Sequence, residues 1–251
     1  NKNITFLPYF SEYYGNCSSL YEFGQVAKEK LDESRRIVAN ALNADEKEIF
    51  FTSGGSESDN QAILSIANFG KRKGKTHIIS TAFEHHAVLH TLKKLEKEGF
   101  EITLLPVHSN GIVRLEDLKN AVKDTTCLVS IMFANNEIGS IQPIKEIGAF
   151  CRENGIIFHT DAVQAVGHVN IDVKEMNIDL LSLSAHKFHG PKGVGALYVR
   201  RGVPIYPLIE GGAQEKGKRA GTENLAGIVG MAVALKDAVL NLPNYTKKVS
   251  A

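Results

Sequence analysis

Short apolar runs alternate with helical patterns along most of the chain. Apolar positions recur at helical spacing within residues 56–72, 85–98, 115–122, 143–155 and 225–240, and strand-like apolar runs occupy residues 48–52, 76–81, 101–107, 127–133, 156–160, 180–184 and 194–199. Continuous apolar strands separated by amphipathic helices predict an α/β fold, with a mostly parallel sheet flanked by helices on both faces. In such sheets, ligands bind just beyond the carboxyl ends of the strands.

No linker or fixed-period repeat divides the chain, so we expect a single domain over residues 1–251. Residues 1–45 read as helix and turn without an obvious strand. The last helix, expected to end near Leu240, runs into a polar stretch with no closing element after it. Because both ends look unfinished, we expect the chain to be a fragment of a longer protein.

Charge and composition narrow the class of protein. There are 29 Lys and Arg residues against 28 Asp and Glu, a formal net charge of +1, which gives no field that favours nucleic acid or an anionic membrane. No apolar run approaches the ~20 residues of a spanning helix, and the first ten residues do not read as a signal peptide. The odd number of distant cysteines (Cys17, Cys127, Cys151) argues against disulfides. We therefore expect a cytoplasmic protein with no nucleic-acid or membrane partner.

Two glycine-rich stretches resemble phosphate-binding loops and a histidine pair resembles a metal site, but the spacing excludes both interpretations. Residues 70–76 have too few residues between their glycines for a phosphate-binding loop, and residues 212–219 place Arg219 where Ser or Thr must reach magnesium. His86 and His90 lie four residues apart on one helix face, but no Cys or carboxylate stands beside them at zinc-like spacing. We expect no metal.

The segment Thr52–Glu57 joins a predicted strand to the start of a helix. Gly54 and Gly55 let the backbone approach a ligand, and Ser56 can cap the helix. Free N–H groups at a helix start form a site for an anion, most simply phosphate. Taken alone, the segment is better explained by a plain serine cap with a turn glycine.

Two further residues stand at predicted strand ends. Asp161 could pair with a buried cation, or simply cap the next turn. Lys187 follows a buried strand, where lost solvation would lower the pKa of its amine and make it nucleophilic, although lysine in such a loop is often a surface charge. Lys192 competes for the same role, but its flanking glycines indicate a solvated position.

Together, the anion site, the aspartate and the lysine match the needs of one cofactor. Pyridoxal 5'-phosphate requires a phosphate cradle, a lysine that binds its aldehyde, and a carboxylate that keeps the ring nitrogen protonated. Each signal is weak alone, but all three are predicted at one sheet edge.

With these residues in view, the sequence resembles the cysteine desulfurases of the NifS/IscS type, within the class V aminotransferase group of fold-type I pyridoxal-phosphate enzymes. The resemblance implies the large domain of that aspartate aminotransferase-like fold. It rests on six segments in family order: TSGGSESDNQAI (Thr52–Ile63), EHHAV (Glu84–Val88), ANNEIGSIQPI (Ala134–Ile144), HTDAVQAVG (His159–Gly167), SAHKFHGPKGVGALYVRRG (Ser184–Gly202) and KRAGTEN (Lys218–Asn224).

The resemblance implies roles around the cofactor ring. Lys187 would bind the aldehyde covalently and later move the α-proton, and Asp161 would pair with the ring nitrogen. His85 would stack on the ring and take part in proton transfer. Gln164 would hydrogen-bond the phenolic oxygen, and Asn136 would lie beside the ring and help to hold the substrate carboxylate.

It also implies a phosphate site. Gly55, Ser56, Ser184 and His186 would hold the phosphate, and Thr222 would reach the phosphate of the partner subunit in a homodimer. The family usually has Ala-Thr where this chain has Gly55-Ser56, and serine keeps the hydroxyl.

The cysteines depart from the family pattern. Cys17 stands where the family commonly has proline, and none of Cys17, Cys127 and Cys151 matches the sulfur-accepting cysteine. Cys17 is the one candidate substitute, because helix-start amides could lower its thiol pKa. The acceptor cysteine, the substrate-binding arginine and an opening segment are expected in regions that this chain lacks, namely an N-terminal segment and a C-terminal small domain.

The implied activity is conversion of L-cysteine to L-alanine. The sulfur would leave as an enzyme persulfide and go to iron–sulfur clusters or another sulfur-containing cofactor, through a sulfur-acceptor or iron–sulfur scaffold protein. A selenocysteine lyase or an aminotransferase of the same group would share Lys187 and Asp161. A catalytically silent scaffold homologue is the alternative from another class, and bound-cofactor absorbance would separate it from the enzymes.

Overall fold

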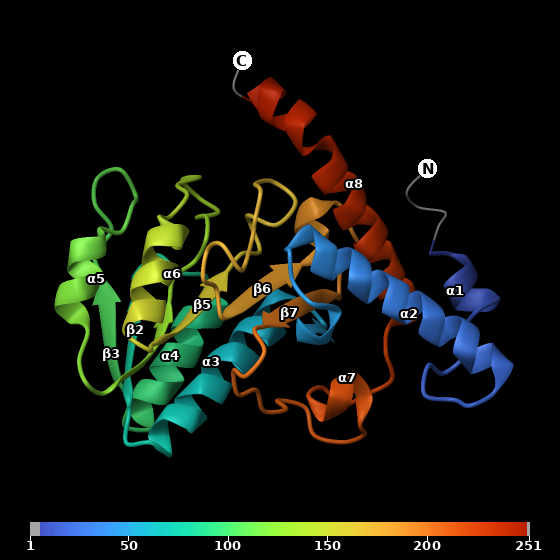
Figure 1. Ribbon diagram of the computed structural model, residues 1–251, viewed down its shortest axis with the longest axis horizontal. Coiled ribbons are helices and arrows are strands. Elements are labelled where there is room, and N and C mark those ends of the chain that lie inside the picture. Colours follow the sequence, from blue (N-terminus) through green and yellow to red (C-terminus); the bar gives the residue numbers. More distant parts are fainter. Residues whose placement is uncertain (1–5, 250–251) are drawn as a thin grey trace.

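A computed structural model describes residues 6–249 and arranges them as helices on both faces of a seven-stranded sheet (Figure 1). The strand order is β1-β7-β6-β5-β4-β2-β3. Every strand expected from the apolar runs is present, so the α/β prediction is confirmed. The strands are β1 (Ile49–Thr52), β2 (His77–Thr81), β3 (Glu101–Leu105), β4 (Thr126–Ser130), β5 (Ile157–Asp161), β6 (Leu180–Ser184) and β7 (Gly195–Val199).

The sheet is mixed, because β7 runs against the other strands. Strands β3, β2, β4, β5 and β6 pair in parallel, whereas β7 pairs antiparallel with both β6 and β1. Since β1 is antiparallel to β7, it points the same way as β6. The carboxyl ends of β1, β2, β4, β5 and β6 therefore lie at one edge of the sheet, where ligands bind in this class of fold.

The helices form two layers. Helices α3 and α4 share one core cluster with one side of the sheet, and α2, α5, α6 and α8 share the other cluster with the opposite side. The helices are α1 (Pro8–Ser11), α2 (Glu22–Ala41), α3 (Gly55–Lys71), α4 (His86–Lys97), α5 (Leu115–Ala121), α6 (Ile144–Glu153), α7 (Gln214–Gly217) and α8 (Leu225–Val249), with 3-10 turns η1 (Glu46–Glu48) and η2 (Ala185–Phe188).

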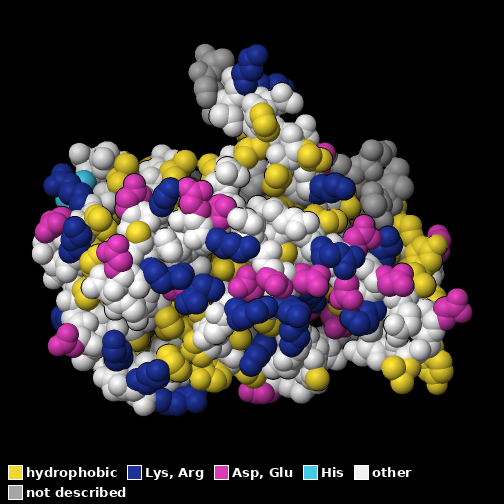
Figure 2. Space-filling model, in the orientation of Figure 1, with side chains coloured by type: hydrophobic (Ala, Val, Ile, Leu, Met, Phe, Trp, Pro, Cys, Tyr) yellow, Lys and Arg dark blue, Asp and Glu magenta, His cyan; other side chains and the backbone are white. Residues whose placement is uncertain are grey.

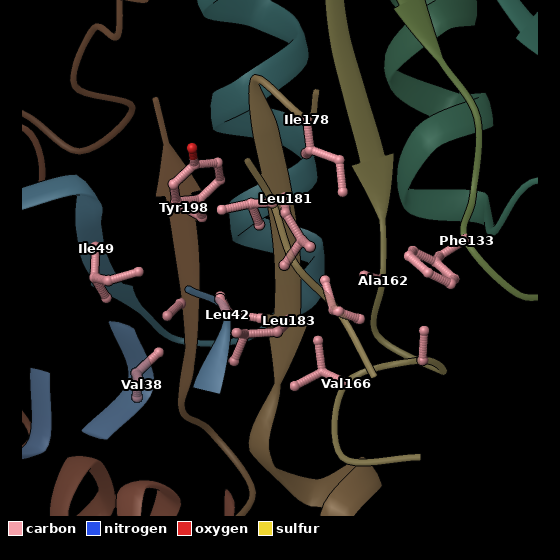
Figure 3. Packing of buried hydrophobic residues seen from close by; sticks show 14 of the residues in the cluster. Val38, Leu42, Ile49, Phe133, Ala162, Val166, Ile178, Leu181, Leu183 and Tyr198 are labelled. Carbon is pink, nitrogen blue, oxygen red and sulfur yellow. The ribbon is translucent and has the colours of Figure 1, made fainter. Parts of the chain in front are cut away.

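Side chains along β6 pack against both helix layers. Leu181 and Leu183 point into the α2–α8 layer, where Figure 3 shows them with Val38 and Val166, whereas Leu180 belongs to the α3–α4 layer. All three leucines are fully buried. Burying a side chain of this size contributes ~1.5–3 kcal/mol, so a run that is apolar on both faces holds the central strand firmly between the layers.

Helix α8 differs from its predicted extent. It was expected to end near Leu240, but it continues to Val249 with Pro243 inside it, and its C-terminal part extends away from the body (Figure 1). Proline removes one helical N–H but fits a helical φ, so it does not by itself end the helix. The expectation that no run approaches membrane-spanning length is also wrong: residues 225–248 are long and apolar enough. That is weak evidence for a membrane span, because 56% of the apolar window is buried and a core helix meets the same criterion.

Surface charge is mixed on the face drawn in Figure 2. Lys and Arg side chains lie interspersed with Asp and Glu there, rather than gathering into a single basic patch. This distribution agrees with the formal net charge of +1.

Candidate active site

A cavity of about 210 Å³ opens at the carboxyl edge of the sheet. Its walls come from the segments that follow β1, β2, β4, β5 and β6, which lie far apart in the sequence. All of the predicted site residues except Thr222 line it: Gly55, Ser56, His85, Asn136, Asp161, Gln164, Ser184, His186 and Lys187. The arrangement follows from strand direction, since these segments leave the sheet at the same edge.

Helix α3 begins at this edge through a glycine turn. Gly54 is the N-cap residue with φ of +151°, a backbone conformation that favours glycine, so the expectation that Ser56 caps the helix is wrong. A Cβ atom on Gly55 would lie 2.6 Å from Cγ2 of Val163, so the backbone here packs tightly against the segment after β5. Ser56 lies in the first turn of α3, where backbone N–H groups have no helical partner and can bind an anion.

Asp161 is the last residue of β5 and is buried in the cavity wall. Its Oδ1 accepts a hydrogen bond from the N–H of Val163 at 2.9 Å, so it caps the next turn as well as facing the cavity. Burial raises the pKa of its carboxyl group, and the N–H of Val163 and the nearby His85 and Lys187 oppose that rise. A buried carboxylate in this position can pair with a cation in the cavity.

Lys187 lies in η2, directly after β6, and is half-buried at the cavity. Its backbone carbonyl lies 2.9 Å from Nε2 of His168, which holds the turn in place. Lys192 lies outside the cavity, in an adjoining open groove that it shares with Gly54 and Gly193. Of the two lysines, Lys187 is therefore the one that reaches the same space as Asp161.

Ser184 and His186 lie beside the start of α3, where a Cβ atom on Gly55 would be 3.8 Å from Cβ of Ser184. The Oγ of Ser184 lies 2.9 Å from Nδ1 of His186. The pKa of the His186 imidazole is lowered, chiefly by burial and then by the positive charges of Lys187 and Lys192. A hydroxyl group, an imidazole and a helix start placed together supply the donors that a phosphate group needs.

The remaining predicted residues border the cavity from three segments. His85 is the N-cap of α4, and its Nδ1 accepts the N–H of Ala87 at 3.2 Å, which leaves Nε2 as the nitrogen that bears the proton when the ring is neutral. Asn136 is exposed in the turn after β4, where Asn135 Oδ1 accepts the N–H of Glu137. Gln164 follows Asp161 on the same cavity wall.

Sequence reasoning missed two buried acids in this region. Asp59 of α3 lines the cavity, and Glu84, just before His85, is buried beside it. Burial raises the pKa of Glu84 to about 8. The sequence did hold a signal for Asp59, which shares a helix face with Gly55 and Ile63 at spacings of four residues, where an apolar side chain is expected.

Thr222 lies apart from the cavity. It is exposed in the segment between α7 and α8, whereas its neighbour Arg219 is tied to Glu57 of α3 by hydrogen bonds of 2.9 and 3.3 Å. The expected role of Thr222, toward the phosphate of a partner subunit, stays a prediction.

The cysteines are buried and free. The suggestion that helix-start amides activate Cys17 is wrong, because burial raises the pKa of its thiol to about 11. Burial also raises the pKa of Cys127 to about 11 and that of Cys151 still further. Within residues 6–249, no group of three or more His, Cys, Asp and Glu side chains could hold a metal ion, and His86 and His90 form only a ring pair with centroids 5.2 Å apart.

The residues around the cavity fit pyridoxal phosphate. A buried carboxyl group, a lysine and a set of phosphate donors line one space, as a ring nitrogen, an aldehyde and a phosphate require. Glycine at positions 54 and 55 leaves room for backbone contact, since a side chain at Gly55 would collide with Val163. The buried Asp161 also lacks an arginine or lysine hydrogen-bond partner among the described residues, which suits it to a cationic ligand atom.

Known proteins resemble the chain in sequence and in structure. The family model described as "Aminotransferase class-V" matches residues 5–242. The chain is 62% identical over 244 residues to "Cysteine desulfurase IscS" of Clostridium botulinum, covering 97% of this chain and 61% of that protein. It is 60% identical over 236 residues to the protein of the same name from Methanosarcina thermophila, with 94% and 58% covered. The chain thus spans about three fifths of the length of these relatives.

Solved structures of similar proteins superpose closely on this chain. A "NIFS-LIKE PROTEIN" superposes with a TM-score of 0.94 at 43% identity, covering 96% of this chain and 67% of that one. A structure titled "SspA in complex with cysteine" gives a TM-score of 0.89 at 42% identity, with 92% and 67% covered.

Proposed function

We propose that this chain, which belongs to the aminotransferase class-V family, is the cofactor-binding part of a cysteine desulfurase. Pyridoxal phosphate is the cofactor of this family, as the sequence predicted. The activity, the substrate and the partners of the whole protein form the proposal, because the chain spans only part of its relatives.

One observation carries the proposal. Lys187 and Asp161 leave neighbouring strands, β6 and β5, and line the same cavity as the glycine turn that begins α3. When bound there, the cofactor supplies an electron-accepting ring that stabilises the charge left by a departing α-proton. The rest of the chemistry falls to side chains of the chain.

The side chains divide the work by position. Lys187 would hold the cofactor through its aldehyde, and its Nζ would carry the substrate α-proton. Asp161 holds a proton on the ring nitrogen through a charge-assisted hydrogen bond. His85 would lie against the ring with its Nε2 available for proton transfer, and Gln164 and Asn136 would orient the phenolic oxygen and the substrate carboxylate.

The phosphate is held by the turn at Gly55 and Ser56 and by the Ser184–His186 pair. Donors of this kind bind the anion without using any of the groups that move protons. In the homodimer that we propose, Thr222 of the partner subunit completes this site.

The reaction balances without an external oxidant. An enzyme thiol takes sulfur from L-cysteine: the Cβ–S bond breaks, an S–S bond forms in the enzyme persulfide, and L-alanine leaves with a proton in place of sulfur. We propose that the full protein works in the cytoplasm and passes this sulfur to an acceptor or scaffold protein for iron–sulfur clusters or other cofactors. The names of the relatives support the desulfurase assignment.

The test is a product assay on the full protein loaded with pyridoxal phosphate. With L-cysteine and a reducing thiol we expect alanine and sulfide in equal amounts, and loss of both in Lys187→Ala but not in Lys192→Ala. Asp161→Asn should keep part of the cofactor and lose most turnover, because a neutral pyridine is a poor electron acceptor. Transfer of the amino group to a keto acid, or activity on selenocysteine alone, would assign the protein to a related enzyme, and no cofactor absorbance would indicate a scaffold.

A further inference from the structure

Asp59 is a buried carboxyl group in the cavity wall that the roles above leave unused. It lies on α3, is 1% exposed, and lines the cavity together with Asp161. Within residues 6–249, its Oδ1 has no hydrogen-bond partner. A buried carboxylate oxygen without a donor is costly, so the protonation state of Asp59 needs a physical explanation.

The neighbouring side chain of His159 supplies no positive charge to Asp59. Nε2 of His159 lies 3.6 Å from Oδ1 of Asp59, but His159 is fully buried between the hydroxyl groups of Ser130 and Ser182, at 2.8 and 3.0 Å. Burial lowers the pKa of the imidazole to about 3. His159 is therefore neutral at ordinary pH and cannot stabilise a carboxylate as an ion-pair partner.

The surroundings of Asp161 differ from those of Asp59. Asp161 accepts the backbone N–H of Val163 and interacts favourably with His85 and Lys187. The negative charge of Asp161 opposes ionisation of Asp59, and only the Ser182 hydroxyl favours the charged form. Glu84 also lies close, but its own pKa of about 8 keeps it protonated at pH 7. Burial and the charge of Asp161 both raise the pKa of Asp59.

Two neighbouring buried carboxyl groups do not both ionise easily, and the proton goes to the one whose surroundings stabilise charge less. We propose that Asp59 is a positioning residue that carries a proton as the neutral member of a carboxyl pair, so that the negative charge stays on Asp161 at the cavity wall. The inference deepens the proposed function, in which Asp161 faces the ring nitrogen. Its first test needs neither cofactor nor turnover.

The first test is infrared spectroscopy of the full protein freed of cofactor and labelled with carboxyl-¹³C aspartate. The label separates aspartic acids from the protonated Glu84. At pH 7 we expect an aspartic-acid carbonyl band in the wild type that disappears in Asp59→Asn and persists in the exposed control Asp124→Asn. In Asp161→Asn the band should persist and titrate at lower pH, because the repelling charge has gone, whereas in Ser182→Ala it should titrate at higher pH.

Three results would overturn the proposal: no aspartic-acid band in the wild type at pH 7, a band that survives Asp59→Asn, or a band lost in Asp161→Asn. The wild-type spectrum alone decides the first of these, so the test does not depend on the folding of any variant. A purely structural role for Asp59 would leave the band and its titration unchanged in Asp59→Asn.

A second measurement asks which carboxyl group is the charged one. Asp161→Asn should weaken binding of pyridoxal phosphate about tenfold or more, the equivalent of losing a charge-assisted hydrogen bond, whereas Asp59→Asn should stay within about twofold of the wild type. Equal losses in both variants would overturn the proposal. If the wild type binds no pyridoxal phosphate, the proposed function fails, and the infrared result still decides the state of Asp59.

Discussion

The guanidinium group of Arg35 holds the carboxylate of Glu215 through two hydrogen bonds of 2.7 Å, although 180 residues separate them in the sequence. Both side chains are buried, and Glu215 also accepts the backbone N–H of Phe51 at 2.9 Å. Glu215 and Lys216 have φ values of 47° and 59°, a left-handed conformation that is unfavourable for such residues. Glu215 lies in a strained turn of the segment that precedes Thr222. Its hydrogen bonds to Arg35 and Phe51 thus anchor this turn to α2 and β1.

Removing one partner of this pair should destabilise the protein strongly. Glu215→Gln leaves Arg35 buried with an uncompensated charge, which costs about 3–5 kcal/mol in free energy of unfolding. Urea unfolding would measure the loss. The exposed pair Lys30–Glu33 supplies the control, since Glu33→Gln should change stability by less than about 1 kcal/mol. Equal effects of the two substitutions would contradict the buried-pair argument.

The second prediction concerns the lysine that binds the cofactor. Reduction of the loaded protein with borohydride, followed by peptide mass mapping, should place the pyridoxyl group on Lys187, because Lys187 lines the cavity and Lys192 lies in the adjoining groove. Lys187→Ala should abolish the label and Lys192→Ala should keep it. Label on Lys192 would contradict the assignment.

The third prediction is a pH dependence caused by Glu84. Its pKa is about 8 in the folded protein against an ordinary 4.5, so the folded state holds a proton that the unfolded state releases, and stability falls as pH rises from 4.5 to 8. His159, with its pKa lowered to about 3, acts in the opposite sense below its ordinary 6.5. The Glu84 effect is therefore clearest between about pH 6.5 and 8, where it amounts to about 2 kcal/mol.

Glu84→Gln should remove that part of the slope, because glutamine keeps the oxygen that accepts from Thr81 and Met132 but does not titrate. Chemical unfolding of the apo protein at several pH values would measure it. The exposed Glu98→Gln is the control and should leave the slope unchanged. A slope that survives in Glu84→Gln would mean that the other buried acids account for all of it.

Much of the site was predictable because apolar strands that alternate with amphipathic helices favour parallel pairing. Runs that are apolar on both faces indicate a mostly parallel sheet, and parallel strands bring Asp161 and Lys187 to one edge without any knowledge of tertiary contacts. The reversal of β7 was not predictable in this way, since an apolar run reads the same in both directions. The continuation of α8 past Pro243 was missed for a similar local reason, because proline is compatible with a helix when its lost hydrogen bond is tolerated.

The buried acids escaped prediction because their effect depends on packing. Asp59 breaks the apolar face of α3, but only the contact of that helix with β5 and β6 brings it to Asp161 and His159. Glu84 looks like an ordinary loop residue until its hydrogen bonds to Thr81 and Met132 show it to be inside. Long-range contacts of this kind are absent from any local pattern.

The fourth prediction concerns the match between Gly55 and Val163. An alanine at position 55 places its Cβ 2.6 Å from Cγ2 of Val163, so Val163 must move, and the turn next to Asp161 must move with it. Gly55→Ala should therefore weaken pyridoxal-phosphate binding. Val163→Ala in the same chain should restore it, because it removes the colliding methyl group. Gly99→Ala, remote from the cavity, controls for a general loss of stability, because its φ of +92° strains alanine although no atom collides with the new Cβ. Failure of the double variant to recover binding would contradict steric coupling.

The last prediction is that none of Cys17, Cys127 and Cys151 accepts sulfur. Cys17 is buried, and with its pKa at about 11 only ~1 thiol in 1,000 is ionised at pH 8, whereas sulfur transfer requires a thiolate close to the substrate sulfur. We expect Cys17→Ser to leave alanine and sulfide production from L-cysteine unchanged in the full protein, and the 251-residue chain alone to bind cofactor without releasing sulfide. Brief alkylation of the native protein should likewise leave Cys17 unmodified. If the chain alone released sulfide and Cys17→Ser removed that activity while the protein stayed folded, Cys17 would be the acceptor, and the buried thiol would have to become exposed during turnover.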